Sequence, residues 1–328
     1  MAHMTKQTIL SGIRASGKLH LGNYLGALKQ FVDLQNTEAN NCFFFIADLH
    51  ALTTNFEPKE IKKNTLEVAA EYLAAGIDPN KSTFFIQNHI LEHATLSWIF
   101  ECGTPLGELQ RMTQYKDKAK LQKGKINVGL LTYPALMASD ILLYKPDLVP
   151  VGDDQTQHLE LTRIVAKKFN NRFGHTFPEP KNYLMKPLRI MSLTNPGKKM
   201  SKTGDEALLL DDSPQEIMRK LKKAVTASES GKKSPGVENL FVLLEHFGSL
   251  EEIKFFRQQQ RDGSLKFSEL KETLAKEIAR YFEGFREKKH ELLAKSGYIA
   301  EILGQGAHKA RAVASKTLME VKEKIGLL

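Results

Sequence analysis

The sequence predicts an α/β protein, in which a parallel sheet covered by helices on both faces is followed by a smaller all-helical domain. Short apolar runs without polar alternation are separated by helical patterns over roughly the first 190 residues, which is typical of strands buried on both faces. After Met191 the chain becomes loop-rich, and beyond Pro214 it is helical and strongly charged. A length of 328 residues, of which 41% are hydrophobic, is enough for two domains with a real core.

Four continuous apolar runs are the predicted strands. In a parallel sheet of this kind the ligand binds at the carboxyl ends of the strands, so the loops after these runs are where we expect a site. The runs lie at residues 7–10, 42–47, 83–87 and 148–151.

Helical patterns fill the intervals between the runs. Leucines about one turn apart predict a helix over residues 21–34. A proline at its start and a glycine after its end bound a second helix over 58–75, and a third is expected over 155–169. In the charged second part, Ser213 is the expected N-cap of a helix that has Pro214 at its first position.

Composition narrows the class of protein. The formal charge of +9, from 47 basic and 38 acidic residues, is mild evidence for a polyanionic partner, although solubility explains it equally well. Cys42 and Cys102 are too few for a disulfide framework or a zinc site, so we expect a reducing, cytoplasmic location. The apolar runs are far shorter than the ~20 residues that span a bilayer, no secretory signal is evident, and we expect no membrane partner. The opening Met-Ala-His-Met is expected to be a cloning remnant, with Met4 as the native start.

The stretch SGIRASGKLHLGN at residues 11–23 fits two nucleotide-binding motifs. A P-loop needs Ser or Thr directly after Lys18 to hold magnesium, but Leu19 stands there and has no oxygen to offer. The alternative is a helix that starts near Leu19 and places His20 and Asn23 on one face of its first turn. Their side chains and the N–H groups of the helix end can reach triphosphate oxygens, so the P-loop interpretation fails.

A second element, KKMSKT at residues 198–203, supports this alternative. The two elements in this order resemble the paired signature of class I aminoacyl-tRNA synthetases, in which the last position is usually Ser. Further stretches resemble tryptophanyl-tRNA synthetases, among them NYLGALKQFVDLQ, GELQRMTQYKDK and LLTYPALMASDILLYKPDLVPVGDDQTQHLELTR. The resemblance is dense from about residue 7 to residue 203 and looser towards the end of the chain.

The resemblance implies a domain division and a reaction. A Rossmann-like catalytic domain would cover 4–190, a helical tRNA anticodon-binding domain 191–303, and a helix at 304–328 would pack back on the catalytic domain. ATP would activate L-tryptophan to tryptophanyl-adenylate, and the tryptophanyl group would then pass to the 3′ end of tRNA(Trp). The substrate carboxylate is already ionised, so catalysis would consist of positioning and electrostatic stabilisation without an enzyme nucleophile.

The family's amino-acid site implies roles for six residues. Asp140 would accept the indole N–H, and a site built around such a donor rejects a ring that lacks it by up to ~10⁴-fold. An aspartate can also accept a phenol O–H, so tyrosine specificity stays open. His50 would lie near the substrate carboxylate, although a core or surface histidine is an equally good interpretation. The other expected contacts are apolar walls at Met137 and Val151 and amino-group ligands at Tyr133 and Gln155.

ATP contacts are implied at several places along the chain. At residues 152–154 Gly-Asp-Asp stands where the family usually has Gly-Glu-Asp, and Asp154 would bind the ribose, although helix capping is an alternative. Arg14 and Ala15 replace the usual Gln-Pro before Ser16, which adds a cation for a phosphate or carboxylate but removes a rigid proline. The expected ATP-binding residues are Arg14, Ala15, Ser16, Gly22, Asn23, Gly152, Asp153, Asp154, Ile190, Lys199, Met200, Ser201, Lys202 and Thr203.

Five of the implied residues face the charge that develops on the leaving pyrophosphate. His20 and Asn23 would donate hydrogen bonds, and Lys118, Lys199 and Lys202 would supply positive charge. Mg²⁺ would accompany ATP as a cofactor, with no protein ligand evident for it and therefore no metal-binding residue expected.

The implied partners are tRNA(Trp) and L-tryptophan, and members of the family are homodimers. Residues 110–125 carry six basic residues against one acidic, and residues 214–234 six against two. Either region could be a solvated helix face, but together they fit an RNA that contacts both domains. A non-enzymatic alternative is an RNA-binding protein without catalytic activity, but such a protein would have no need of two elements that bind a triphosphate.

Overall fold

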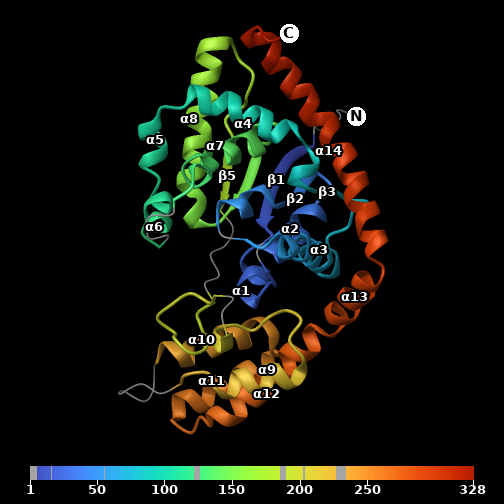
Figure 1. Ribbon diagram of the computed structural model, residues 1–328. Coiled ribbons are helices and arrows are strands. Elements are labelled where there is room, and N and C mark those ends of the chain that lie inside the picture. The colour runs from blue at the N-terminus through green and yellow to red at the C-terminus, as the bar shows by residue number, and fades with distance from the viewer. Residues whose placement is uncertain are drawn as a thin grey trace.

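The computed structural model describes residues 6–15, 17–54, 56–121, 126–184, 190–201, 204–226 and 234–328. Its centre is a five-stranded parallel sheet in the order β3-β2-β1-β4-β5, which confirms the predicted fold class (Figure 1). The strands are β1 Gln7–Arg14, β2 Asn40–Ala47, β3 Ser82–Ile86, β4 Leu148–Val151 and β5 Lys181–Leu184. The α-helices are α1 Leu21–Asn23, α2 Lys29–Gln35, α3 Pro58–Ala74, α4 Glu92–Gly103, α5 Leu106–Gln110, α6 Thr113–Leu121, α7 Val128–Leu142, α8 Thr156–Phe173, α9 Pro214–Lys222, α10 Pro235–Phe247, α11 Leu250–Asp262, α12 Phe267–Tyr281, α13 Glu283–Ala294 and α14 Ser296–Ile325. A π-helix, η1 Tyr24–Leu28, and four short 3₁₀ helices, η2 Leu49–Thr53, η3 Gln87–His89, η4 Asp153–Gln155 and η5 Gly204–Glu206, complete the described elements.

The four predicted strands are confirmed, and β5 is an addition. Its sequence, Lys-Asn-Tyr-Leu, has no continuous apolar run, and Lys181 and Tyr183 are exposed. The predicted helix over 21–34 is also present, but the π-helix η1 interrupts it directly after α1.

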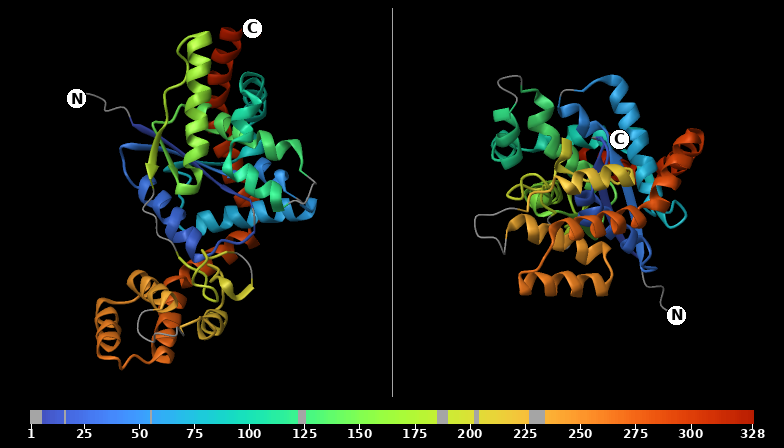
Figure 2. Two further views of the ribbon diagram at one scale, coloured as in Figure 1. Left: turned by 90° about the vertical axis from the view of Figure 1, so that its left-hand side faces the viewer. Right: turned by 90° about the horizontal axis from the view of Figure 1, so that it is seen from below.

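The central strands lack polar alternation because both of their faces are covered. Phe44 of β2 stacks on Phe31 of α2 with ring centroids 5.0 Å apart. The next side chain along, Phe45, points to the opposite face and stacks on Phe85 of β3 at 5.7 Å. Helices α2 and α3 cover the first face, and α4, α7 and α8 cover the second (Figures 1 and 2).

The long helix α14 lies along the β3 edge of the sheet (Figure 1). At Gly306 its backbone approaches the carbonyl oxygen of Phe84 so closely that an added Cβ would lie 1.8 Å from it. Glycine at this position therefore sets how near α14 packs to the sheet.

The chain reverses its strand order next to β1. This strand lies between β2 on one side and β4 on the other, so the connections leave it in opposite directions. Such a switch point opens a crevice at the carboxyl ends of the two strands, here after Arg14 and Val151.

The segment after the KKMSKT element is hydrogen-bonded to the segment before α1. The N–H of Leu21 donates to the carbonyl of Leu208 at 2.9 Å, and the N–H of Leu210 donates to the carbonyl of Leu19 at 3.0 Å. His20 and Leu209 form an isolated antiparallel bridge between these bonds. The two elements singled out in the sequence therefore belong to one local structure.

A group of charged side chains, the Glu71 cluster, lies beneath this pairing and consists of Lys18, Glu71, Asp211 and Lys289. Lys289 of α13 is 4% exposed and pairs with Glu71 at 2.7 Å and with Asp211 at 2.8 Å. Glu71 of α3 is fully buried, and its other carboxylate oxygen accepts the N–H of Leu19. Lys18 pairs with Asp211 at 2.9 Å. The cluster thus connects α3, α13 and both paired segments.

Helices α9 to α12 lie below the sheet, and α13 leads back from them to α14 (Figures 1 and 2). The hydrophobic core is nevertheless continuous, because Leu21 and Leu28 belong to the same buried cluster as Leu208, Leu221 and Phe241. Among the described residues, none of the helices is long and apolar enough to cross a membrane.

We expect Lys289→Met to destabilise the protein by about 3–5 kcal/mol, because the fully buried Glu71 would lose its cation while Asp211, which is partly exposed, would keep Lys18. Urea unfolding measures the change, with Lys288→Met as the control, since Lys288 is exposed on the same helix and should change the free energy of unfolding by no more than ~0.5 kcal/mol. Equal unfolding midpoints for the two variants would show that the Glu71 cluster contributes nothing.

Candidate active site

A cavity of about 300 Å³ opens at the carboxyl ends of β1 and β4, where the strand order predicts a crevice. Its wall comes from β1, η2, α7 and β4, with Gln155 at its rim. All six residues predicted for the amino-acid site line it, and so do Arg14 and Gly152 from the predicted ATP set. The six are His50, Tyr133, Met137, Asp140, Val151 and Gln155.

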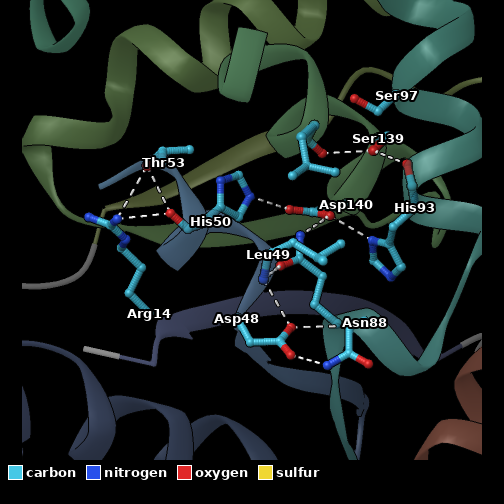
Figure 3. A network of polar contacts seen from close by, with 12 residues as sticks. Arg14, Asp48, Leu49, His50, Thr53, Asn88, His93, Ser97, Ser139 and Asp140 are labelled. Carbon is cyan, nitrogen blue, oxygen red and sulfur yellow. Dashed lines mark hydrogen bonds and ion pairs between the residues drawn. The ribbon is translucent and has the colours of Figure 1, made fainter. Parts of the chain in front are cut away.

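Asp140 of α7 lies at the inner end of this cavity and is 1% exposed. Its Oδ2 pairs with His50 Nε2 at 2.7 Å, and its Oδ1 pairs with His93 Nδ1 at 2.6 Å and accepts a hydrogen bond from Gln87 Nε2 at 2.7 Å (Figure 3). Burial alone would raise the pKa of Asp140, but the hydrogen bonds from His50 and His93 outweigh it and hold that pKa at about 2. The cavity therefore contains a buried carboxylate that stays ionised at neutral pH.

The predicted place of His50 near the substrate carboxylate stays a prediction. Its ring contacts Asp140, and its backbone carbonyl accepts a hydrogen bond from Arg14 Nη2 at 2.8 Å. The interpretation as a plain surface histidine is wrong, because His50 joins the two charged groups of the cavity wall (Figure 3).

Arg14, the last residue of β1, brings a positive charge to the cavity wall. Its Nη2 also donates to Thr53 Oγ1 at 3.3 Å, but its Nε is shielded from solvent and has no hydrogen-bond partner among the residues that the structure describes. Burial lowers the pKa of Arg14, yet a guanidinium starts so high that it stays charged at neutral pH. An anionic group of a ligand could accept a hydrogen bond from the Nε–H of Arg14.

The two residues predicted for the amino group, Tyr133 and Gln155, are held by protein contacts. The Tyr133 hydroxyl and His158 Nε2 are 2.7 Å apart. The amide nitrogen of Gln155 donates to Asp154 Oδ2 at 2.7 Å, which leaves its carbonyl oxygen to accept from an ammonium.

At the start of α1, His20 and Asn23 bind the end of their own helix. His20 is the N-cap, its Nδ1 accepts the N–H of Gly22 at 3.1 Å, and Asn23 Oδ1 accepts the N–H of His20 at 3.2 Å. These atoms form a capping box. The box uses one acceptor atom of each side chain and no side-chain donor, so the predicted donation of both residues to a triphosphate stays a prediction.

The backbone of Gly22, which is half-buried, lies next to Ile190. A Cβ added at Gly22 would lie 3.9 Å from the Cβ of Ile190. The carbonyl of Ile190 accepts the N–H of Met200 at 2.9 Å, and Met191 bridges Lys199, so the KKMSKT element reaches the same place.

Other predicted ATP residues fall into three environments. Ala15 and Met200 have buried side chains within the core, so only their backbone could contact ATP. Lys199 is exposed, and Ser201 donates to Glu206 at 2.8 Å. Ser16, Lys202 and Thr203 lie outside the described residues, and Lys118 lies on α6 with an undescribed side chain.

Asp153 and Asp154 lie in η4, between β4 and α8. The Asp154 carboxylate is exposed and accepts from the side chains of Gln155 and Gln114, not from a helix N–H. The capping alternative therefore does not describe Asp154. At Gly152 an added Cβ would lie 2.9 Å from Asp154 Oδ1, so a side chain here would displace that carboxylate.

Sequence reasoning missed the inner part of the site. Gln87 ends a predicted strand and could have been suspected from that position, but His93 and Tyr144 carry no motif. Their relevance depends on the packing of α4 against α7, which places both rings behind Asp140.

Three comparisons relate this arrangement to known proteins. The family model described as tRNA synthetases class I (W and Y) matches residues 3–294. A tryptophan–tRNA ligase of Caldanaerobacter subterraneus subsp. tengcongensis is 49% identical over 98% of this chain and 98% of its own length. The crystal structure of tryptophanyl-tRNA synthetase from Campylobacter jejuni, complexed with ADP and tryptophan, has a TM-score of 0.86 and 37% identity over 97% of this chain and 99% of that one.

These matches extend over nearly the whole chain and agree with the cavity and the paired motifs. The chain therefore belongs to the class I tRNA synthetases for tryptophan and tyrosine, among the tryptophan–tRNA ligases.

Proposed function

We propose that this chain activates L-tryptophan with ATP and transfers it to tRNA(Trp), as a tryptophan–tRNA ligase. The observation that carries the proposal is the buried, ionised carboxylate of Asp140 in a cavity at the carboxyl ends of β1 and β4. An indole N–H is a donor without an acceptor, and Asp140 supplies the complementary group.

Within the cavity the substrate would extend from Asp140 towards Arg14. The ring N–H binds the cavity side of the carboxylate, and Met137 and Val151 pack against the apolar ring surface. The carbonyl oxygen of Gln155 and the Tyr133 oxygen accept from the ammonium group. Arg14, whose Nε has no hydrogen-bond partner among the described residues, binds the substrate carboxylate and the α-phosphate, both of which are negatively charged.

The nucleotide would lie over the start of α1. Gly22 and Ile190 flank the adenine, Asp154 binds the ribose, and Asn23 donates to a phosphate oxygen. Lys118, Lys199 and Lys202 stabilise the leaving pyrophosphate as the tryptophan carboxylate attacks the α-phosphorus. The rate enhancement would come from holding the tryptophan carboxylate in line with the α-phosphorus, since no covalent enzyme intermediate is required.

Mg²⁺ would enter with ATP. Among the described residues there is no group of three or more His, Cys, Asp or Glu side chains that could hold a metal ion. The triphosphate oxygens are therefore the ligands that fit it, and the metal would supply charge neutralisation there.

For tRNA(Trp) we propose that the helical part, residues 191–303, reads the anticodon, while the body at 4–190 with the helix from 304 carries the reaction. The basic region at 214–234 contributes less than its composition suggests. Lys220 is buried against Asp212 at 2.7 Å, and Arg219 and Lys223 both pair with Asp205. Among the described residues, this leaves the exposed Lys222 and the region around Lys116 as the basic groups available to bind the phosphates of the RNA.

We propose a homodimer in the cytoplasm. Leu52, Trp98 and Val128 are large apolar residues on the surface, and Leu52 and Trp98 line a groove between η2 and α4 that also contains Tyr133. An exposed apolar face of this kind fits a self-complementary contact with a second copy. Both cysteines are free thiols, Cys42 buried and Cys102 exposed, as expected in a reducing compartment.

We expect Asp140→Asn to raise the KM for tryptophan by about 10- to 100-fold, because the ring N–H loses a charged acceptor. Tryptophan-dependent pyrophosphate exchange measures this change, with tyrosine tested in parallel and with Asp33→Asn, an exposed position on α2, as the control. A wild-type enzyme that prefers tyrosine would establish the alternative specificity, and an unchanged KM in Asp140→Asn would refute the assigned contact.

We expect Lys202→Ala to slow adenylate formation by ~10²–10³-fold, with little change in the Kd for tryptophan, because this lysine would stabilise the leaving pyrophosphate and not the amino acid. Single-turnover kinetics and equilibrium dialysis separate the two effects, and Lys168→Ala on α8 serves as an exposed control. An unchanged rate of adenylate formation would remove Lys202 from the reaction.

A further inference from the structure

The carboxylate of Asp140 has a protected side and a cavity side. Gln87 and His93 both contact Oδ1, and neither of these residues lines the cavity. His50 contacts Oδ2 and does line it. Each carboxylate oxygen has about two acceptor positions. Both acceptor positions of Oδ1 are therefore occupied by residues that do not line the cavity, whereas Oδ2 keeps one acceptor position that faces the cavity.

His93 connects Asp140 to a second buried group. It lies in the first turn of α4, is fully buried, and its Nε2 is 2.9 Å from the hydroxyl of Tyr144. Tyr144 follows the end of α7 and is 3% exposed. Three polar groups thus form a row from the phenol through the imidazole to the carboxylate.

The direction of the hydrogen bonds along this row follows from ionisation. Burial, and then the negative charge of Asp140, raise the pKa of Tyr144, so its hydroxyl keeps its proton. A buried hydroxyl donor needs an acceptor, and the group it meets is His93 Nε2. The neutral tautomer that accepts at Nε2 carries its proton at Nδ1, which then donates to Asp140 Oδ1.

The backbone of His93 is fixed as well. Its carbonyl oxygen lies 2.8 Å from the hydroxyl of Ser139, which precedes Asp140 on α7 and shares its one proton between this carbonyl and that of Leu136 at 2.7 Å (Figure 3). The imidazole and the carboxylate are therefore held together by a side-chain contact and by a neighbouring backbone contact.

We propose that His93 and Tyr144 are positioning residues for amino-acid recognition, in which Tyr144 selects the tautomer of His93 and His93 holds Oδ1 so that Oδ2 faces the substrate ring N–H. This inference rests on the proposed contact between Asp140 and the indole. His93 and Tyr144 touch no substrate in it, and they act through the orientation of the carboxylate.

The test compares tryptophan with β-(benzothiophen-3-yl)alanine, in which sulfur replaces the ring N–H. Pyrophosphate exchange gives kcat and KM for each amino acid, and the ratio of the two kcat/KM values reports recognition of the N–H alone. The variants are His93→Ala, which removes the donor, His93→Asn, whose amide nitrogen can occupy the Nδ1 position, and Tyr144→Phe, which removes the phenol O–H. Tyr72→Phe is the matched control, since Tyr72 is fully buried on the other face of the sheet and its hydroxyl has no hydrogen-bond partner in the described part of the chain.

We expect the preference for tryptophan to fall about 10- to 100-fold in His93→Ala, through the KM for tryptophan and not the KM for ATP, because a hydrogen bond to a charged group is lost. Tyr144→Phe should lower the preference by about 3- to 10-fold, whereas His93→Asn and Tyr72→Phe should retain it. If His93→Ala does not fold, Tyr144→Phe is compared with Tyr72→Phe instead, and the ratio of kcat/KM for tryptophan to that for the benzothiophene analogue tests the proposal.

A preference that stays at the wild-type value in both His93→Ala and Tyr144→Phe overturns the proposal, as does an equal loss of activity towards both amino acids, which is the result of a purely structural role. Asp140→Asn separates this failure from failure of the proposed function. If Asp140→Asn loses the preference while the His93 and Tyr144 variants keep it, the indole contact stands and the positioning role falls. If Asp140→Asn also keeps it, the indole contact itself is wrong.

Discussion

The structure depends on the pairing of two chain segments that are far apart in the sequence. Residues 19–21 and 208–210 exchange two backbone hydrogen bonds, and the Glu71 cluster fixes the pairing from below. Glu71 binds both the N–H of Leu19 and the ammonium of Lys289, so the start of α1, the segment after the KKMSKT element and α13 share one buried charge group. Without this pairing the two motifs would have no fixed position relative to one another, and they could not bind one triphosphate together.

A second constraint lies at the inner end of the cavity. An ionised carboxylate without partners is costly to bury, and the three hydrogen bonds to Asp140 offset that cost. Under the proposed function the same arrangement would make the site selective, because a ring without a donor would leave the remaining acceptor position of Asp140 unpaired. Arg14 places the complementary charge at the other end of the cavity wall, and His50 contacts both groups through different atoms.

Much of the fold could be predicted because it depends on local pattern. Continuous apolar runs marked four strands, and the two motifs indicated where the chain must converge. The amino-acid residues were predicted by resemblance, and all six line the cavity. The edge strand β5 was missed because its exposed Lys181 and Tyr183 leave no continuous apolar run. The capping box at His20 and Asn23 was missed because these side chains bond equally well to a phosphate or to a helix N–H, and sequence spacing cannot separate the two. His93 and Tyr144 were missed because their role exists only once α4 packs against α7.

We propose that one ligand spans the carboxylate of Asp140 and the backbone at Gly22 and Ile190. A crystal structure with a sulfamoyl analogue of tryptophanyl-adenylate, in which the sulfamoyl group stands in for the α-phosphate, tests this directly. We expect the indole nitrogen within about 2.7–3.2 Å of Asp140 Oδ2 and the adenosine against Gly22 and Ile190. An indole ring that leaves Oδ2 without contact, or an adenosine bound away from those two residues, would contradict it.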